Sequence, residues 1–172
     1  MDSLVNVFNR RSIRKYTDQK ISKDDLHTIL RAGMAGPSCA NTRDWSFIVV
    51  EDKETLIKMA DANGIYAAPL KGAALGILIL GDLERSVEVA KDYWIIDGSI
   101  AGQNMILAAN ALGIGSVWLG TYPQMDRVER QRELFRLPED KIPHSIIAFG
   151  YPAEEGVLKP DYEEDRVHFE KW

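Results

Sequence analysis

The stretch ALGILILGD, residues 74–82, lies within the longest apolar run of the chain. A continuous apolar run of this length is typical of a strand that is buried on both faces. It is too short to span a bilayer, which requires about 20 apolar residues in a helix. The sequence therefore predicts a central strand with a layer of structure on each side.

Strands and helices are predicted to either side of this run. Residues 45–51, 116–120 and 145–152 read as further core strands, and helices are predicted for residues 3–10, 22–36, from Asp52 onward, and for 92–112 and 124–136. Ser22 and Asp52 are the predicted N-caps of their helices. We interpret residues 1–172 as a single α+β domain.

Two segments indicate contact with another subunit. The helix at 92–112 is rich in small residues and apolar on most sides, which places it at the centre of the molecule or at a subunit contact. The tail from Ala153 onward is polar but ends on aromatic residues. We expect such a tail to dock on a partner subunit.

Composition narrows the function classes. The 172 residues carry a formal net charge of −5 and include one cysteine, Cys39. The charge argues against long-range attraction to nucleic acid or to an anionic membrane. A single cysteine excludes an internal disulfide and any cluster built from cysteines. No apolar core of signal-peptide length follows the first residues, so we expect a soluble, cytoplasmic protein.

A basic cluster contrasts with this acidic background. The stretch NRRSIRKYTDQKIS, residues 9–22, places Arg10, Arg11 and Arg14 around Ser12. One interpretation is a solvated helix end, where cations meet the negative end of the helix dipole. The other is a phosphate clamp, in which the guanidinium groups and the hydroxyl donate to one anion. If the segment is extended, alternate side chains point the same way.

Two loops next to predicted strands add weaker signals. In AGPSCANTRDWSFIVV, residues 35–50, Pro37, Ser38 and Asn41 form a turn, and Asn41 could also recognise an imide edge. In GIGSVWLGTYP, residues 113–123, a glycine after a strand lets a ligand approach the backbone, although a plain turn has the same spacing. The second loop lacks the remaining elements of a dinucleotide fingerprint.

The side chains that could support other kinds of catalysis do not have the sequence spacing of a catalytic or metal site. His27, His144 and His168 have no partner at a catalytic or metal-ligand spacing, and Cys39 has no activating neighbour in the sequence. We expect no catalytic side chain and no metal.

Taken together, the motifs resemble a known family. RRSIRKY at 10–16, GPSCANTRDW at 36–45 and GQNMILAANALGIGSVWLG at 102–120 occur in the order seen in the nitroreductase family of FMN enzymes. The resemblance extends to FGYP at 149–152 and to the tail DRVHFEKW. The second motif departs from the family pattern, because Arg43 and Asp44 precede Trp45.

The resemblance implies a homodimer of three-layer sandwiches, each with a mostly antiparallel central sheet, FMN at the subunit interface, and a C-terminal tail over the partner. Arg10, Arg11 and Ser12 resemble the phosphate and ribityl contacts, and Arg14 the cation beside N1 and O2 of the flavin ring. The remaining flavin contacts that the resemblance implies are Pro37, Ser38 and Asn41 in the other subunit's site, the backbone of Leu119 and Gly120 near N5 and O4, and Arg166 or Lys159 at the phosphate.

The activity that the resemblance implies is oxidation of NADH or NADPH and reduction of nitroaromatics, quinones or similar acceptors in a ping-pong cycle. The flavin would carry out the redox chemistry. Two alternatives stay open. One is a specialised family member that acts as a flavin reductase, dehalogenates or fragments flavin, and the other is a flavin-binding protein without catalysis.

Overall fold

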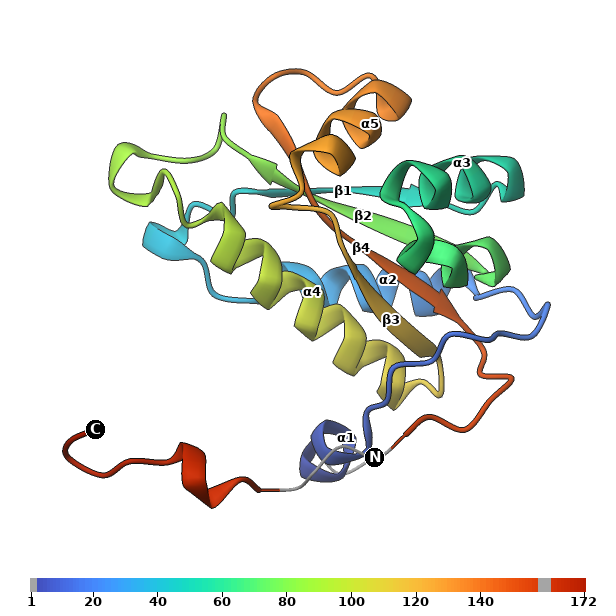
Figure 1. Ribbon diagram of the computed structural model, residues 1–172, viewed down its shortest axis with the longest axis horizontal. Helices are drawn as coiled ribbons and strands as arrows, with labels where there is room; N and C mark the ends of the chain where they lie inside the picture. The colour runs from blue at the N-terminus through green and yellow to red at the C-terminus, as the bar shows by residue number, and fades with distance from the viewer. Residues whose placement is uncertain (1–2, 158–161) are drawn as a thin grey trace.

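Four antiparallel strands form the centre of the computed structural model, which describes residues 3–157 and 162–172. The strands are β1 (Trp45–Val50), β2 (Leu75–Asp82), β3 (Gly115–Gly120) and β4 (Lys141–Gly150), and their order across the sheet is β1-β2-β4-β3 (Figure 1). β2 and β4 are therefore the inner strands. The predicted antiparallel arrangement is confirmed for every pair of neighbours.

Helices cover both faces of the sheet and complete three layers. Figure 1 shows α2 (Lys23–Met34) and α4 (Trp94–Ala111) on one face, with α3 (Lys53–Asn63) and α5 (Met125–Phe135) on the other. The short helix α1 (Ser3–Asn9) lies at the C-terminal end of α4, where Asn110 Nδ2 donates to Asn6 Oδ1 at 2.7 Å. The 3₁₀ segments are η1 (Cys39–Asn41), η2 (Ile65–Gly72), η3 (Glu88–Ala90) and η4 (Glu164–Arg166).

The apolar run of β2 supplies both cores. Every residue of β2 is buried, as predicted. Leu78 and Leu80 pack in the cluster below α3, whereas Ile77 and Ile79 pack in the cluster below α2 and α4. This separation follows from the alternation of side chains along a strand.

The predicted helix starts are also confirmed. Ser22 Oγ accepts a hydrogen bond from Asp25 N at 3.0 Å, and Asp52 Oδ2 accepts from Thr55 N at 2.8 Å. These bonds satisfy backbone donors that the first turn of a helix leaves unpaired.

Two elements differ from the sequence-based prediction. β4 begins at Lys141 rather than at residue 145, and η2 was not predicted. Pro143 lies within the early part of β4, opposite Leu80, where the register shifts between Ile79 and Leu80. A proline and polar residues at the start of a strand resemble a turn in sequence. The sequence pattern therefore places the start of β4 too late in the chain.

Candidate functional site

The basic segment runs as an extended chain along β3 and then beside the end of β4. Ile13 N donates to Ser116 O at 2.9 Å, and Thr17 N donates to Tyr151 O at the same distance. The side chain of Ile13 is buried against Gly115, whereas Arg14 is exposed. The predicted alternation is therefore present: one side chain enters the core and its basic neighbour faces outward.

The three arginines of this segment have different surroundings. Arg11 Nη1 donates to Phe8 O at 2.9 Å and to Arg10 O at 3.1 Å, so this guanidinium binds carbonyls at the end of α1. This is the helix-end interpretation of the cluster. Within the described residues, the Arg10 guanidinium makes no hydrogen bond or ion pair and remains available to an anion.

A carboxylate that the motifs did not indicate lies beside Arg14. Glu154 Oε1 accepts hydrogen bonds from Arg14 N at 2.6 Å and from Lys15 N at 3.1 Å. Because Glu154 follows β4 by a few residues, it ties the basic segment to the sheet through the backbone. Among the described residues, the Arg14 guanidinium itself makes only a long contact of 3.4 Å to Ser12 O.

A cavity of about 200 Å³ brings three of the predicted residues together at the end of β3. Arg14 lines it together with Leu119 and Gly120. Apart from Gly120 itself and its two neighbours in the chain, no described residue has an atom within 4 Å of the position that a Cβ would occupy at Gly120. The backbone at the strand end therefore leaves room for a ligand, whereas the spacing of the loop sequence alone favoured a plain turn.

Besides Val117 and Trp118 of β3 itself, the cavity is lined by three residues that lie outside the motifs and were missed in the sequence: Asn63, Tyr66 and Arg127. Asn63 Nδ2 and Arg127 Nη1 both donate to Gly120 O, at 3.1 and 2.9 Å. These bonds hold the end of β3 in position. They come from α3 and α5, far apart in sequence, and neither helix carries a motif that would indicate them.

One residue that lines the cavity also makes a close helix–sheet contact. Trp118 lines the cavity, and its ring packs against Gly102 of α4. A Cβ at Gly102 would lie 2.9 Å from Ile79 Cδ1 and closer still to the Trp118 ring. Only a residue without a side chain fits this contact.

Gly102→Ala is expected to lower the free energy of unfolding by about 1–3 kcal/mol, because overpacking outweighs the gain in helix propensity. Denaturant unfolding measures the change. Gly72→Ala is the matched control, since nothing lies within 4 Å of its Cβ position. Equal stability of the two variants would contradict the packing argument.

The other predicted loop lies away from this cavity in the single chain. Pro37, Ser38 and Asn41 follow α2, and Figure 1 shows η1 at the opposite end of α2 from the basic segment. Ser38 Oγ accepts from Arg43 N at 2.9 Å, which closes the loop on itself. Within one chain these residues do not join Arg14 and Gly120.

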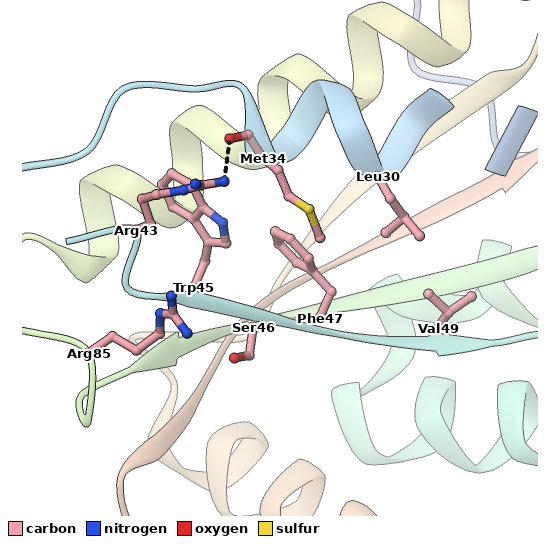
Figure 2. Close-up of a pocket in the computed structure, with 8 residues that line it drawn as sticks. All are labelled: Leu30, Met34, Arg43, Trp45, Ser46, Phe47, Val49 and Arg85. Atoms are coloured by element: carbon pink, nitrogen blue, oxygen red, sulfur yellow. Dashed lines mark hydrogen bonds between the residues drawn. The ribbon is translucent and has the colours of Figure 1, made fainter. Parts of the chain in front are cut away.

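A hollow of about 460 Å³ lies beside β1, next to this loop. Figure 2 shows Arg43 reaching it from the loop before β1, Arg85 from the turn after β2, and Met34 and Phe47 between α2 and the strand. Arg43 Nη2 donates to Met34 O at 3.4 Å. The unusual Arg43 thus belongs to a wall that is both basic and apolar.

The tail leads away from the sheet. Figure 1 shows its last described part extending past α1, and within the described residues Arg166 forms its ion pair with neighbouring Glu163. The structure therefore does not bring Arg166 to the basic segment of the same chain. Lys159 lies outside the described residues. Phe169 and Trp172 are exposed in the single chain.

The buried histidine has a structural environment. His144 Nε2 donates to Ile95 O at 2.9 Å, and the ring lies edge-on to Trp94 and Trp118. Burial lowers the pKa of His144 below its ordinary value, so the ring is neutral at pH 7. Its contacts stabilise α4 against β4 and leave it outside the cavity.

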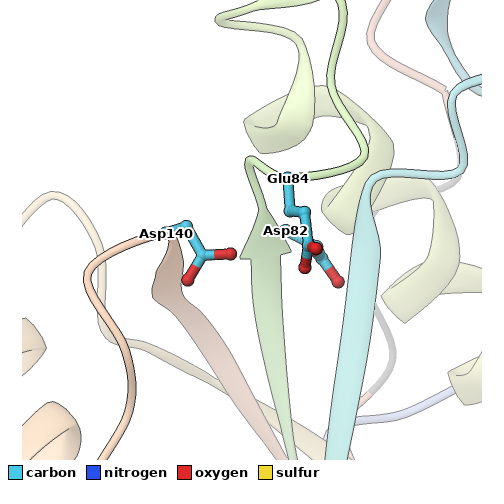
Figure 3. A group of neighbouring side chains, drawn as sticks. All are labelled: Asp82, Glu84 and Asp140. Carbon is cyan, nitrogen blue, oxygen red and sulfur yellow. The ribbon is translucent and has the colours of Figure 1, made fainter.

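Three carboxylates that could in principle hold a metal ion already bind a lysine. Asp82, Glu84 and Asp140 gather where β2 ends and β4 begins (Figure 3). Lys141 Nζ lies 2.7, 3.1 and 2.5 Å from their oxygens, respectively. The ammonium group supplies the positive charge that the cluster requires.

Comparison with known proteins identifies the family. The Nitroreductase family model matches residues 7–151, so the chain belongs to the nitroreductase family. An inferred NADH dehydrogenase/NAD(P)H nitroreductase of Methanothermobacter thermautotrophicus is 45% identical over 100% of this chain and 88% of its own length. The FMN reductase [NAD(P)H] of Bacillus subtilis is 26% identical, covering 98% of this chain and 73% of that protein.

A solved structure agrees with this assignment. The FMN-dependent nitroreductase of Clostridium difficile R20291 superposes with a TM-score of 0.90 and 35% identity, covering 98% of this chain and 99% of the other. The predicted α+β sandwich is thereby confirmed. None of the helices in residues 3–157 and 162–172 has the length and apolarity that a membrane span requires.

Proposed function

We propose that this protein is an FMN-dependent oxidoreductase that takes electrons from NADH or NADPH and reduces nitroaromatics, quinones or similar small acceptors. One observation carries the proposal: Arg14, Leu119 and Gly120 converge on one cavity at the end of β3. These are the residues that the family motif pairs with the flavin ring. The proposal includes a single flavin-binding domain over residues 1–172 and action in the cytoplasm.

The donors around the cavity fit a flavin. Bound FMN would supply hydride and electron transfer at its ring. Arg14 places a cation at the cavity wall, where it would favour the negative charge that reduction adds near N1 and O2. The open backbone at Gly120 allows close approach of the opposite edge of the ring.

The phosphate site is proposed at the start of the basic segment. The Arg10 guanidinium is free of hydrogen bonds within the described residues. Ser12 lies between Arg10 and Arg14 on the extended segment. Arg11 holds the end of α1 and in this way positions the segment. In the proposed clamp Arg10 carries most of the affinity for the phosphate, because Arg11 already has carbonyl partners.

A homodimer with two shared sites is part of the proposal. Pro37, Ser38 and Asn41 lie away from the cavity of their own chain, so they are free to reach a cavity in a second copy. The outer side of α4 carries a hollow of about 420 Å³, lined by Ile95, Ile96, Ser99, Ile100, Gln103 and Asn104. Such an apolar helix face and the exposed aromatic tail both favour contact between copies.

The test of this function is the colour and redox response of the purified protein. We expect released FMN, identified by mass spectrometry, and bleaching of the bound flavin when NADH or NADPH is added without oxygen. Nitroaromatics and quinones should then restore the oxidised spectrum. FAD in place of FMN would contradict the clamp, and a yellow protein that neither nucleotide bleaches would indicate flavin binding without this catalysis.

A further inference from the structure

Two carboxyl groups lie against each other inside the molecule, where the loop before β1 meets α4. Asp44 is completely buried, and Asp97, in the first turn of α4, is 2% exposed. The Asp44 carboxyl faces the Asp97 carboxyl and the Ser86 hydroxyl. Burying an ionised carboxylate is costly, so two of them together require either a cation or a proton.

The hydrogen bonds that the described residues make around the pair satisfy Asp97 but leave the Asp44 carboxyl without a donor. The two Asp97 oxygens accept from Cys39 N at 3.2 and 3.0 Å, and Ser86 Oγ donates elsewhere, to Ala90 O at 3.1 Å. Neither oxygen of Asp44 receives a hydrogen bond from the described part of the chain. A protonated carboxyl can donate, and a proton on one member of the pair would therefore satisfy the other.

The cations of the surrounding elements face other groups. Arg43 and Arg85 line the hollow beside β1, and Lys141 is held by its own three carboxylates. His144, on the side of α4 toward β4, is neutral and bonded to the helix backbone. Among the described residues, Asp97 is the charged group that acts on Asp44.

We propose that Asp44 and Asp97 share one proton, and that this proton holds the Ser38–Arg43 loop against α4. The loop needs such support, because Ala40, Asn41 and Arg43 have φ angles of 49°, 55° and 52°. This left-handed backbone is unfavourable for Ala40 and Arg43, whereas asparagine adopts it more readily. Asp97 holds the start of the loop by accepting a hydrogen bond from Cys39 N. Asp44, which directly follows the loop, holds its end by sharing the proton with Asp97.

The pair is thus a positioning device for the loop that carries Pro37, Ser38 and Asn41. Its relevance to flavin binding rests on the proposed function, but the shared proton does not. Asp44 and Arg43 are also the two residues by which this chain departs from the family motif. The departure therefore adds a proton-dependent contact to this loop.

The dependence on pH follows from the direction of the shift. Burial, followed by the Asp97 carboxyl, raises the pKa of Asp44 from 3.8 to about 6. The folded protein then holds the proton more tightly than the unfolded chain. The stabilisation is complete below about pH 4 and is lost as the pH rises through 6, where Asp44 ionises.

The experiment compares denaturant unfolding of the purified wild-type protein and of Asp44→Asn from pH 4 to pH 7, at one protein concentration. Asparagine keeps the size of the side chain and donates at every pH. The ratio of the unfolding equilibrium constants, wild type over variant, is expected to rise about a hundredfold, since each pKa unit is tenfold. A ratio that does not change with pH overturns the shared proton.

Asp52→Asn is the matched control. The hydrogen bonds from Thr55 lower the pKa of Asp52, so its contribution to stability grows as the pH rises. The same ratio for this variant should therefore move in the opposite direction. If Asp44→Asn does not fold, infrared spectra of the wild type replace it: a protonated carboxyl band should persist up to about pH 6, and its absence there overturns the proposal.

Cys39 provides a separate readout of the loop, because it is the only cysteine of the chain. The rate at which a thiol reagent labels Cys39 is measured at each pH for the wild type and for Asp44→Asn. The effect of thiol ionisation cancels in the ratio of the two rates. We expect the wild-type loop to label relatively faster as the pH rises from 5 to 8. Equal relative rates would show that the proton does not hold the loop. Neither readout measures redox activity, so both outcomes are independent of the proposed activity.

Discussion

Deletion of residues 159–172 is expected to convert the proposed dimer into monomers and to weaken flavin binding by about tenfold or more, the effect of losing one hydrogen bond to a charged group. In the single chain the described part of this tail leaves Tyr162 68%, Phe169 82% and Trp172 101% exposed. Aromatic groups of this size gain free energy when another surface covers them. Light scattering measures the mass, and filtration with absorbance measures the retained flavin.

Two variants separate the functions of the tail. Replacement of both Phe169 and Trp172 by alanine keeps its charges and should weaken the dimer. Arg166→Ala keeps its aromatic residues and should weaken flavin binding while the dimer persists. A truncated protein that remains dimeric and retains its flavin would contradict the shared site.

Arg10→Ala is expected to weaken FMN binding by about 1.5–3 kcal/mol, the range for a hydrogen bond to a charged group. At roughly 1.4 kcal/mol per factor of ten, the dissociation constant should rise between about tenfold and a hundredfold or more. The Arg10 guanidinium has no hydrogen-bond partner in the described chain, so the loss falls on the ligand. Flavin titration followed by fluorescence gives the constant.

Arg14→Ala is expected to act on the reduced flavin instead. Removing this cation from the cavity should lower the two-electron midpoint potential by on the order of 30–60 mV, the equivalent of one charge-assisted bond. Arg14→Lys should restore part of the potential, and Arg31→Ala, an exposed arginine of α2, should change neither property. An unchanged potential in Arg14→Ala would place the cation elsewhere, and an unchanged affinity in Arg10→Ala would refute the clamp.

The parts of the fold that were predictable are those with local causes. The apolarity of β2 reflects its two buried faces, and the caps at Ser22 and Asp52 are hydrogen bonds over three residues. The start of β4 was missed because its pairing with β2 is set by strands about 60 residues apart, while its own residues include Pro143. Pairing with a strand that lies far away in the sequence leaves no signal in the first residues of β4 themselves.

The same distinction applies to the site. Arg14, Leu119 and Gly120 belong to motifs that can be recognised, and the cavity brings them together. Asn63 and Arg127 reach Gly120 from helices that read as ordinary amphipathic segments. Arg11 illustrates the converse: its position in the motif indicates an anion, but in this chain its guanidinium holds the end of α1.

The strand order β1-β2-β4-β3 also determines when the molecule can fold during synthesis. β3 is made before β4, yet β4 is its only neighbour among the four strands of the sheet. In a nascent chain that ends at residue 120, β3 therefore lacks its strand partner in the sheet and, among the described residues, can pair only with the basic segment, through Ile13. Contacts between residues far apart in sequence form slowly, and unpaired apolar strands promote aggregation. The sheet can thus close only after β4, up to Gly150, has been synthesised.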